Sequence, residues 1–222
     1  WKIPTSFEKI IFYGISLFFR WEPACKRPAM PQETANREHC ILRVGNLGKK
    51  YHDHWIFRHV KQEFHGGEPY VLDTPSGSGK TTFFRCLCGL ERPEEGEVSG
   101  IDTFSVQFQE DRLCEDYSAV KNLEMVLGDA AQAREILTQL LPEEALDQPC
   151  RELSGGMKRR VSLVRAMEAG AQCVLLDEPF TGLDEESRKR AEAYIRRKAG
   201  GRIMMLATHI RPGEELSQTV RM

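Results

Sequence analysis

The sequence predicts an α/β fold built around a mostly parallel β-sheet, and three observations support this prediction. From residue 40 onward, segments of strand composition alternate with segments of helical pattern, which is the order in which helices connect parallel strands. Residues 173–176 and Ile203–Ala207 are short and apolar, as strands buried on both faces of a sheet are. A turn rich in glycine and serine, residues 74–82, lies between a short strand and a helix.

The elements of the first half are expected from composition and position. Residues 40–44 and 55–64 are rich in β-branched and aromatic side chains, which is typical of strands. Residues 68–73 form a short strand that leads into the glycine-rich turn. Residues 80–90 then follow as a helix, and residues 104–108 as a further strand.

The second half is expected to consist of helices around the two buried strands. Residues 118–142 carry apolar side chains at helical spacing. Residues 154–168 form a further helix, and Glu185–Lys198 form a strongly charged one.

Residues 1–39 differ from the rest and are expected to be an appendage and linker. Residues 10–19 are a run of ten without charge, and a helix of this length spans about 15 Å, half of the roughly 30 Å of a bilayer core. The run is therefore either a helix bound at a membrane surface or to a partner, or an appendage that is poorly ordered or packed locally. Residues 22–39 are polar and rich in proline, as linkers are.

The composition is that of a globular protein with one α/β domain, or with one large and one small domain. The 222 residues include 31 Lys and Arg, 33 Asp and Glu, and 41% hydrophobic residues. This excludes a disordered chain, a collagen-like chain and a polytopic membrane protein. A net charge of −2 also argues against a dedicated nucleic-acid binder, so no nucleic-acid partner is expected. The seven cysteines form no CxxC pair, which favours free thiols over a zinc ribbon or a disulfide framework.

The glycine-rich turn predicts a site for a polyphosphate. Successive N–H groups at the start of a helix donate to phosphate oxygens, and glycines let the backbone approach closely. Lys80 supplies a positive charge to the phosphates, and the Thr81 hydroxyl is a ligand for Mg²⁺. The predicted contact residues are Ser76, Gly77, Ser78, Gly79, Lys80, Thr81 and Thr82. Thr74 occupies the place of the first glycine of the usual pattern, and a positive φ there costs about 1–2 kcal/mol.

Two further motifs carry chemistry. An apolar strand ends in Asp177 and Glu178, which suits one carboxylate to holding Mg²⁺ and the other to activating water. Ser154, Gly155 and Gly156 open a helix, an arrangement that binds anions.

In this order, the motifs resemble those of the ATP-binding subunits of ATP-binding cassette (ABC) transporters, over about residues 40–222. Residues 153–157 (LSGGM) are similar to the family signature, and residues 173–179 (CVLLDEP) to its second nucleotide motif. Four single residues also fall in matching places: Tyr51, Gln109, Asp184 and His209.

The resemblance implies a fold and a set of roles. The fold is a P-loop NTPase core with a mostly parallel sheet, an inserted helical subdomain over about residues 112–160 and an antiparallel β-subdomain. That β-subdomain is expected to be reduced, because only 29 residues separate Lys80 from Gln109. The implied cofactors are ATP and Mg²⁺. The implied catalytic residues are Glu178, His209, Gln109 and Lys80; the implied metal ligands are Thr81, Gln109 and Asp177; and Tyr51, Ser154, Gly155, Gly156 and Asp184 are implied to contact the nucleotide.

The resemblance also implies partners and a location. Two cassettes pair head-to-tail, and Ser154 of one closes on ATP held by the other. The pair drives transmembrane permease subunits, which places the chain in the cytoplasm on the inner face of the membrane. Residues 109–113 (QEDRL) are similar to importers of nitrate, sulfonates and taurine, so the expected cargo is a small anionic or organic solute. The alternatives are a soluble cassette ATPase and an ATP-binding regulatory subunit that does not hydrolyse ATP.

Overall fold

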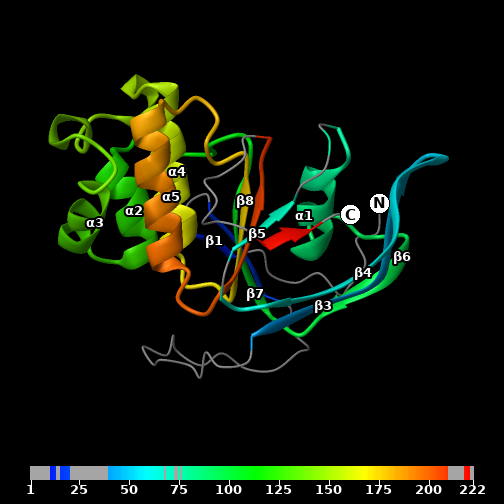
Figure 1. The fold of residues 1–222 in the computed structure, drawn as a ribbon. Coiled ribbons are helices and arrows are strands. Elements are labelled where there is room, and N and C mark those ends of the chain that lie inside the picture. The colour runs from blue at the N-terminus through cyan, green and yellow to red at the C-terminus, as the bar shows by residue number, and fades with distance from the viewer. Residues whose placement is uncertain are drawn as a thin grey trace.

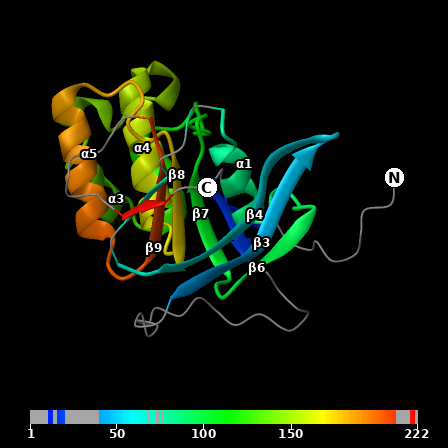
Figure 2. The same cartoon turned by 45° about the vertical axis from the view of Figure 1, so that its right-hand side comes forward.

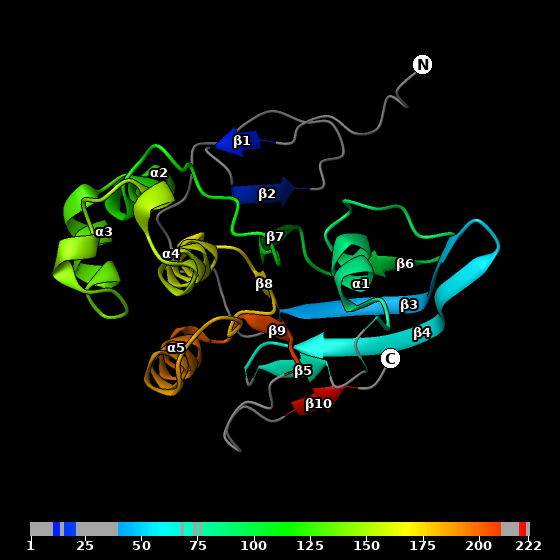
Figure 3. The ribbon, with the colours of Figure 1, turned by 90° about the horizontal axis from the view of Figure 1, so that it is seen from above.

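The computed structural model describes residues 11–13, 16–20, 40–67, 69–72, 75, 77–209 and 218–220. The larger of its two sheets has seven strands. For residues 11–13, 16–20 and 218–220 the description is of the backbone alone. Figure 3 shows the strands side by side in the order β1-β2-β7-β8-β9-β5-β10. The bounds are β1 Ile11–Tyr13, β2 Ser16–Arg20, β7 Thr103–Gln107, β8 Cys173–Asp177, β9 Ile203–Ala207, β5 Tyr70–Leu72 and β10 Gln218–Val220. The five strands from β7 to β10 run parallel, while β2 pairs antiparallel with both β1 and β7.

A second sheet of three antiparallel strands has the order β4-β3-β6. Its strands are β3 Ile41–Tyr51, β4 His54–His65 and β6 Glu95–Ser99. β3 and β4 form a long hairpin that projects from the body of the molecule (Figure 2).

The helices cover the parallel strands on two sides (Figure 1). On one side lie α1 and the antiparallel sheet, and on the other lie α2 to α5. The helices are α1 Lys80–Leu87, α2 Ala119–Leu127, α3 Ala130–Leu137, α4 Gly155–Glu168 and α5 Glu185–Lys198, with short 3-10 turns at Glu143–Ala145 and Cys150–Glu152.

The central strands are buried on both faces, because their side chains alternate between two hydrophobic cores. In β8, Val174 and Leu176 pack into the core beneath α2 to α5, while Cys173 and Leu175 pack into the core shared with α1 and the antiparallel sheet. Every residue of β8 and β9 is buried. The two apolar segments of the sequence are therefore central strands, as predicted.

The fold prediction is confirmed, and three details of it are corrected. The helix expected over residues 118–142 is two helices, because Gly128 adopts a left-handed φ of 78° that ends α2, and Asp129 caps α3. In the part of the uncharged N-terminal run that the structure describes, the residues belong to strands β1 and β2 and not to a helix, which was one of the two interpretations of this run. Strands suit its isoleucines and aromatic residues. The first predicted strand extends to Tyr51, past three irregularities of register after Val44, Leu47 and Lys49.

Besides β1 and β2, two further strands were not expected from the sequence. β6 has the sequence EGEVS, whose glycine and glutamates are poor strand formers, and β10 has only three residues. The boundary at residue 40 and the helical subdomain over about residues 112–160 remain predictions. In the part of the chain that the structure describes, none of the helices is both long and apolar enough to cross a membrane.

A buried asparagine anchors the segment that precedes α2. Asn122 is fully buried, and its side-chain oxygen accepts a hydrogen bond from the Cys114 N–H at 2.9 Å. Its amide donates to the Cys114 carbonyl at 3.0 Å and to the Ser118 carbonyl at 3.0 Å. One side chain thus ties the Cys114 backbone to the first turn of α2.

We expect Asn122→Ala to lower the free energy of unfolding by about 2–3 kcal/mol, because the Cys114 N–H loses its side-chain acceptor and the Cys114 carbonyl loses one of its two donors. Urea titration followed by circular dichroism measures the change. Lys121→Ala on the same helix is the control: the Lys121 side chain is half exposed, so this change should cost less than about 0.5 kcal/mol. Equal effects of the two substitutions would contradict the anchoring role of Asn122.

Candidate functional site: a phosphate loop and the carboxyl ends of the parallel strands

The glycine-rich turn folds as a loop that ends in the first turn of α1. Gly77 and Gly79 have left-handed φ values of 80° and 90°, which glycine adopts without strain. Gly79 precedes α1, and no side chain caps this helix, so its first N–H groups face outward as donors. The ammonium group of Lys80, a buried residue, donates to the Pro75 carbonyl at 3.3 Å. Ser76 and Thr74 lie outside the described residues.

The antiparallel sheet presses directly on this loop. A Cβ atom at Gly79 would lie 2.2 Å from Cγ2 of Ile56 in β4. Only a glycine therefore fits at this position, both for its φ and for its space.

A hydroxyl and a carboxylate meet beside the loop. Oγ1 of Thr81 donates to Oδ2 of Asp177 at 2.5 Å, and Asp177, at the end of β8, is only 2% exposed. Burial raises the pKa of Asp177, as does the neighbouring Glu178, while the Thr81 hydrogen bond and the Lys80 charge oppose the rise. The two protein oxygens are thus held together next to a lysine.

These oxygens fit a magnesium ion that binds with a polyphosphate. Mg²⁺ prefers oxygen ligands and typically takes one or two from the protein and the rest from phosphates and water. Thr81 and Asp177 supply such a pair. Among the residues described, no three His, Cys, Asp or Glu side chains group to hold a metal ion by themselves. The donor set therefore suits a cation that arrives with a phosphate ligand.

Glu178 and His209 face each other at the ends of neighbouring strands. Nδ1 of His209, after β9, lies 2.8 Å from Oε2 of Glu178, after β8. The Glu178 side chain is 15% exposed and that of His209 is 62% exposed. Glu178 has a left-handed φ of 52°, and its N–H donates to the Ala207 carbonyl at 2.7 Å. A non-glycine residue in this conformation is strained, and such strain is concentrated at functional sites.

Gln109 follows β7 and lies at the same edge of the sheet. Gln109 is exposed, while its backbone carbonyl accepts a hydrogen bond from Nη2 of Arg159 in α4 at 2.6 Å. A side chain of α4 therefore anchors the backbone of the segment that begins at Gln109.

Tyr51 is the last residue of β3, and its hydroxyl is held in place while its ring is partly exposed. It is 41% exposed. Its hydroxyl donates to Glu91 and lies within hydrogen-bond reach of Thr82, and the ammonium of Lys49 lies 5.2 Å from the ring centroid. Burial and the Glu91 carboxylate raise the pKa of Tyr51. The exposed ring therefore stands beside the phosphate loop.

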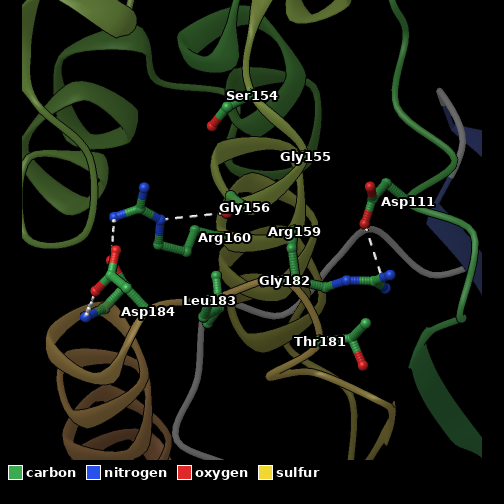
Figure 4. Close-up of a pocket in the computed structure, with 11 residues that line it drawn as sticks. Asp111, Ser154, Gly155, Gly156, Arg159, Arg160, Thr181, Gly182, Leu183 and Asp184 are labelled. Atoms are coloured by element: carbon green, nitrogen blue, oxygen red, sulfur yellow. Dashed lines mark hydrogen bonds and ion pairs between the residues drawn. The ribbon is translucent and has the colours of Figure 1, made fainter.

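The signature residues lie elsewhere, at a pocket of about 540 Å³ between the start of α4 and the loop before α5 (Figure 4). Ser154 caps α4 by accepting from the Met157 N–H at 3.3 Å. Asp184 caps α5 by accepting from the Ser187 N–H at 2.8 Å, which lowers the pKa of Asp184. The residues that line the pocket are Asp111, Ser154, Gly155, Gly156, Arg159, Arg160, Thr181, Gly182, Leu183, Asp184 and Ser187.

The structure thus divides the predicted residues into two groups. Lys80, Thr81, Asp177, Glu178 and His209 gather around the phosphate loop. Ser154, Gly155, Gly156 and Asp184 line the separate pocket, and α4 lies on the opposite face of the sheet from α1 (Figure 1).

Sequence reasoning missed two residues that support these groups. Glu91 holds the Tyr51 hydroxyl, and Arg159 holds the Gln109 carbonyl. Arg159 could have been found from the sequence, because Arg159 and Arg160 are two consecutive arginines inside an otherwise core-facing helix.

Comparison with known proteins agrees with this arrangement. The family model described as "ABC transporter" matches residues 57–181. A probable amino-acid ABC transporter ATP-binding protein of Haemophilus influenzae is 35% identical over 66% of this chain and 68% of its own length. A Nod factor export ATP-binding protein of Cupriavidus metallidurans is 31% identical over 76% of this chain and 63% of its own. An aliphatic sulfonates import ATP-binding protein of Paraburkholderia xenovorans is 33% identical over 76% of this chain and 70% of its own.

A solved structure has the same fold. It is the dimeric structure of an ATP-binding cassette in a post-hydrolysis state bound to ADP and Pi, with a TM-score of 0.67 and 23% identity over 76% of this chain and 88% of that one. The family match covers more than half of the chain, and the relatives are ATP-binding subunits of transporters. The chain therefore belongs to the ABC transporter family and is one of its ATP-binding, ATP-hydrolysing subunits.

Proposed function

We propose that this chain hydrolyses ATP at its phosphate loop and thereby powers the import of a small anionic or organic solute through a membrane permease. The observation that carries the proposal is the meeting of the Thr81–Asp177 pair and the Glu178–His209 pair at the carboxyl ends of adjacent strands. In this proposal, Thr81 and Asp177 supply two oxygens to the metal, Glu178 is the base, and the neighbouring Lys80 binds phosphate.

The loop binds the phosphates of ATP. The N–H groups at the start of α1 donate to the β-phosphate, and Lys80 moves from the Pro75 carbonyl to the β- and γ-phosphates. Thr81 and Asp177, together with the Gln109 side chain, hold Mg²⁺, which when bound neutralises phosphate charge. Tyr51 stacks on the adenine with its exposed ring face.

Glu178 activates the water that attacks the γ-phosphate. Its carboxylate orients this water and accepts its proton. The exposed His209 lies 2.8 Å from this carboxylate. We propose that the γ-phosphate takes over His209 as a partner when ATP binds, which frees Glu178 to contact the water.

The signature completes the site of a second copy. Space is open around Gly155, where an added Cβ would meet nothing within 4 Å. The N–H groups at the start of α4 are donors in need of an acceptor. We propose that they bind the γ-phosphate held by the partner cassette in a head-to-tail pair, and that the pair binds permease subunits at the inner face of the membrane.

The direction of transport is proposed from a short sequence similarity and from the relatives. Residues 109–113 are similar to importers of small anions, and a relative is a sulfonate importer, whereas another relative is an exporter. The sequence also left open a regulatory subunit that binds ATP without hydrolysis, because Thr74 replaces a loop glycine. Membership of an ATP-hydrolysing family opposes this alternative. The contact between Glu178 and His209 favours hydrolysis.

We expect Glu178→Gln to keep ATP binding and to lower turnover by about 10²–10⁴-fold, because only the base is removed. Phosphate release measures turnover, and equilibrium dialysis with ATP measures binding. Lys80→Ala is the contrasting variant and should lose ATP binding itself. Wild-type turnover in the Glu178→Gln chain would reject Glu178 as the base.

We expect the Glu178→Gln chain to dimerise with MgATP and to be mainly monomeric without it, as sedimentation velocity can show. Ser154→Arg in that background should abolish the dimer and spare ATP binding, because Ser154 serves the partner's site. Ser118→Arg is the matched control, since Ser118 caps α2 in the same way, accepting from the Lys121 N–H at 3.1 Å. Loss of the dimer in both variants would indicate a folding defect rather than a role of the signature.

We expect the chain, tagged and purified from membranes, to bring with it a polytopic permease. In vesicles that hold both, ATP should drive a labelled sulfonate or nitrate from the outer to the inner face of the membrane, and Glu178→Gln should stop this transport. Movement in the opposite direction would be consistent with the proposed ATP hydrolysis and would contradict the proposed import.

A further inference from the structure

A buried arginine lies directly beneath the Gln109 loop. Arg159, in α4, is only 7% exposed. Its Nη1 donates to the Phe108 carbonyl at 3.0 Å and its Nη2 to the Gln109 carbonyl at 2.6 Å. One guanidinium group thus binds two consecutive carbonyls at the point where β7 ends.

A carboxylate from the same loop completes the contact. Oδ1 of Asp111 lies 3.3 Å from Nη1 of Arg159. Burial raises the pKa of Asp111, and the charge of Arg159 opposes the rise. A buried guanidinium is costly without such partners, so Arg159 and residues 108–111 fix each other.

The position of Arg159 is itself fixed on the sheet. The Gln107 amide donates to the Arg159 carbonyl at 3.2 Å, and the Ser105 hydroxyl donates to the Ala166 carbonyl at 2.8 Å. Both donors belong to β7, so α4 is tied along this strand. Arg159 therefore holds the loop against a rigid support.

The loop has little regular structure of its own. Arg112 has a left-handed φ of 45°, and its carbonyl accepts from Nη2 of Arg165 at 2.8 Å. Gln109 itself is exposed. The direction of the Gln109 side chain thus depends on how its backbone is held. Arg159 and Arg165 of α4 hold the two ends of the segment of residues 109–112.

We propose that Arg159 is a positioning residue: it orients the backbone of Gln109 so that the Gln109 side chain reaches the metal and the attacking water. This inference rests on the proposed function, in which Gln109 is a metal ligand. A lysine cannot replace Arg159, because its single ammonium lacks the planar fork that binds two carbonyls and a carboxylate together.

The first test is the Mg²⁺ requirement of ATP hydrolysis in Arg159→Lys and Arg159→Gln. We expect the Mg²⁺ concentration for half-maximal activity to rise by about tenfold or more, as loss of supporting contacts to a ligand does. The KM for ATP should change by less than about threefold, because Lys80 and Tyr51 are untouched. Combining Arg159→Lys with Gln109→Ala should be no worse than Gln109→Ala alone, since both act through one group.

The second test needs no activity. Amide hydrogen exchange followed by mass spectrometry should be faster at residues 109–112 in Arg159→Lys and unchanged in β7 and β8. Arg151→Gln is the control: Arg151 binds Asp116, which lies further along the chain than residues 109–112, and an exposed ion pair contributes little. This variant should alter neither the exchange nor the Mg²⁺ requirement.

Three outcomes would overturn the proposal. The first is an unchanged Mg²⁺ requirement together with unchanged exchange at residues 109–112. The second is faster exchange throughout β7 and α4, which would make Arg159 a residue of the core alone. The third is equal effects of Arg151→Gln and Arg159→Lys. Should Gln109→Ala leave the Mg²⁺ requirement unchanged, the role of Gln109 in the proposed function fails, while faster exchange at residues 109–112 would still support Arg159 as the residue that holds the loop.

Discussion

The register of the parallel strands is the constraint on which the rest of the structure depends. Strands buried on both faces must pair every backbone N–H and carbonyl with a neighbour, which aligns Gln107 with Leu176, Asp177 with Ala207, and Leu72 with Ala207. The carboxyl ends of β5, β7, β8 and β9 therefore meet at one edge. The phosphate loop, Gln109, the two carboxylates and His209 all follow these ends, so segments far apart in the sequence share one site.

Three buried side chains inside this frame have specific partners. Lys80 contacts the Pro75 carbonyl, Asp177 contacts the Thr81 hydroxyl, and Arg159 contacts two carbonyls and Asp111. In a buried setting such contacts carry a large penalty if broken. The nucleotide must therefore exchange one set of satisfied contacts for another, which suits a site that alternates between two states.

Local sequence was enough to predict the parts whose chemistry is contiguous. Lys80 and Thr81 share one turn of helix, and Asp177 and Glu178 share one strand end, so the roles proposed for them can be inferred from short motifs. Arg159 was missed because it meets residues 108–111 only after α4 packs on β7. The same holds for β6, whose composition disfavours a strand and which exists because it pairs with β3. Where a tertiary contact decides the outcome, local propensity does not report it.

The close approach of Ile56 to Gly79 has a consequence for how this sequence can vary. Because a Cβ at residue 79 would overlap the Ile56 side chain, neither position is independent of the other. A smaller side chain at residue 56 leaves a gap above the loop, and any larger residue at 79 displaces the hairpin that carries Tyr51. Recombination that replaces β3 and β4 with those of another cassette therefore has to bring a residue at position 56 whose shape fits this glycine.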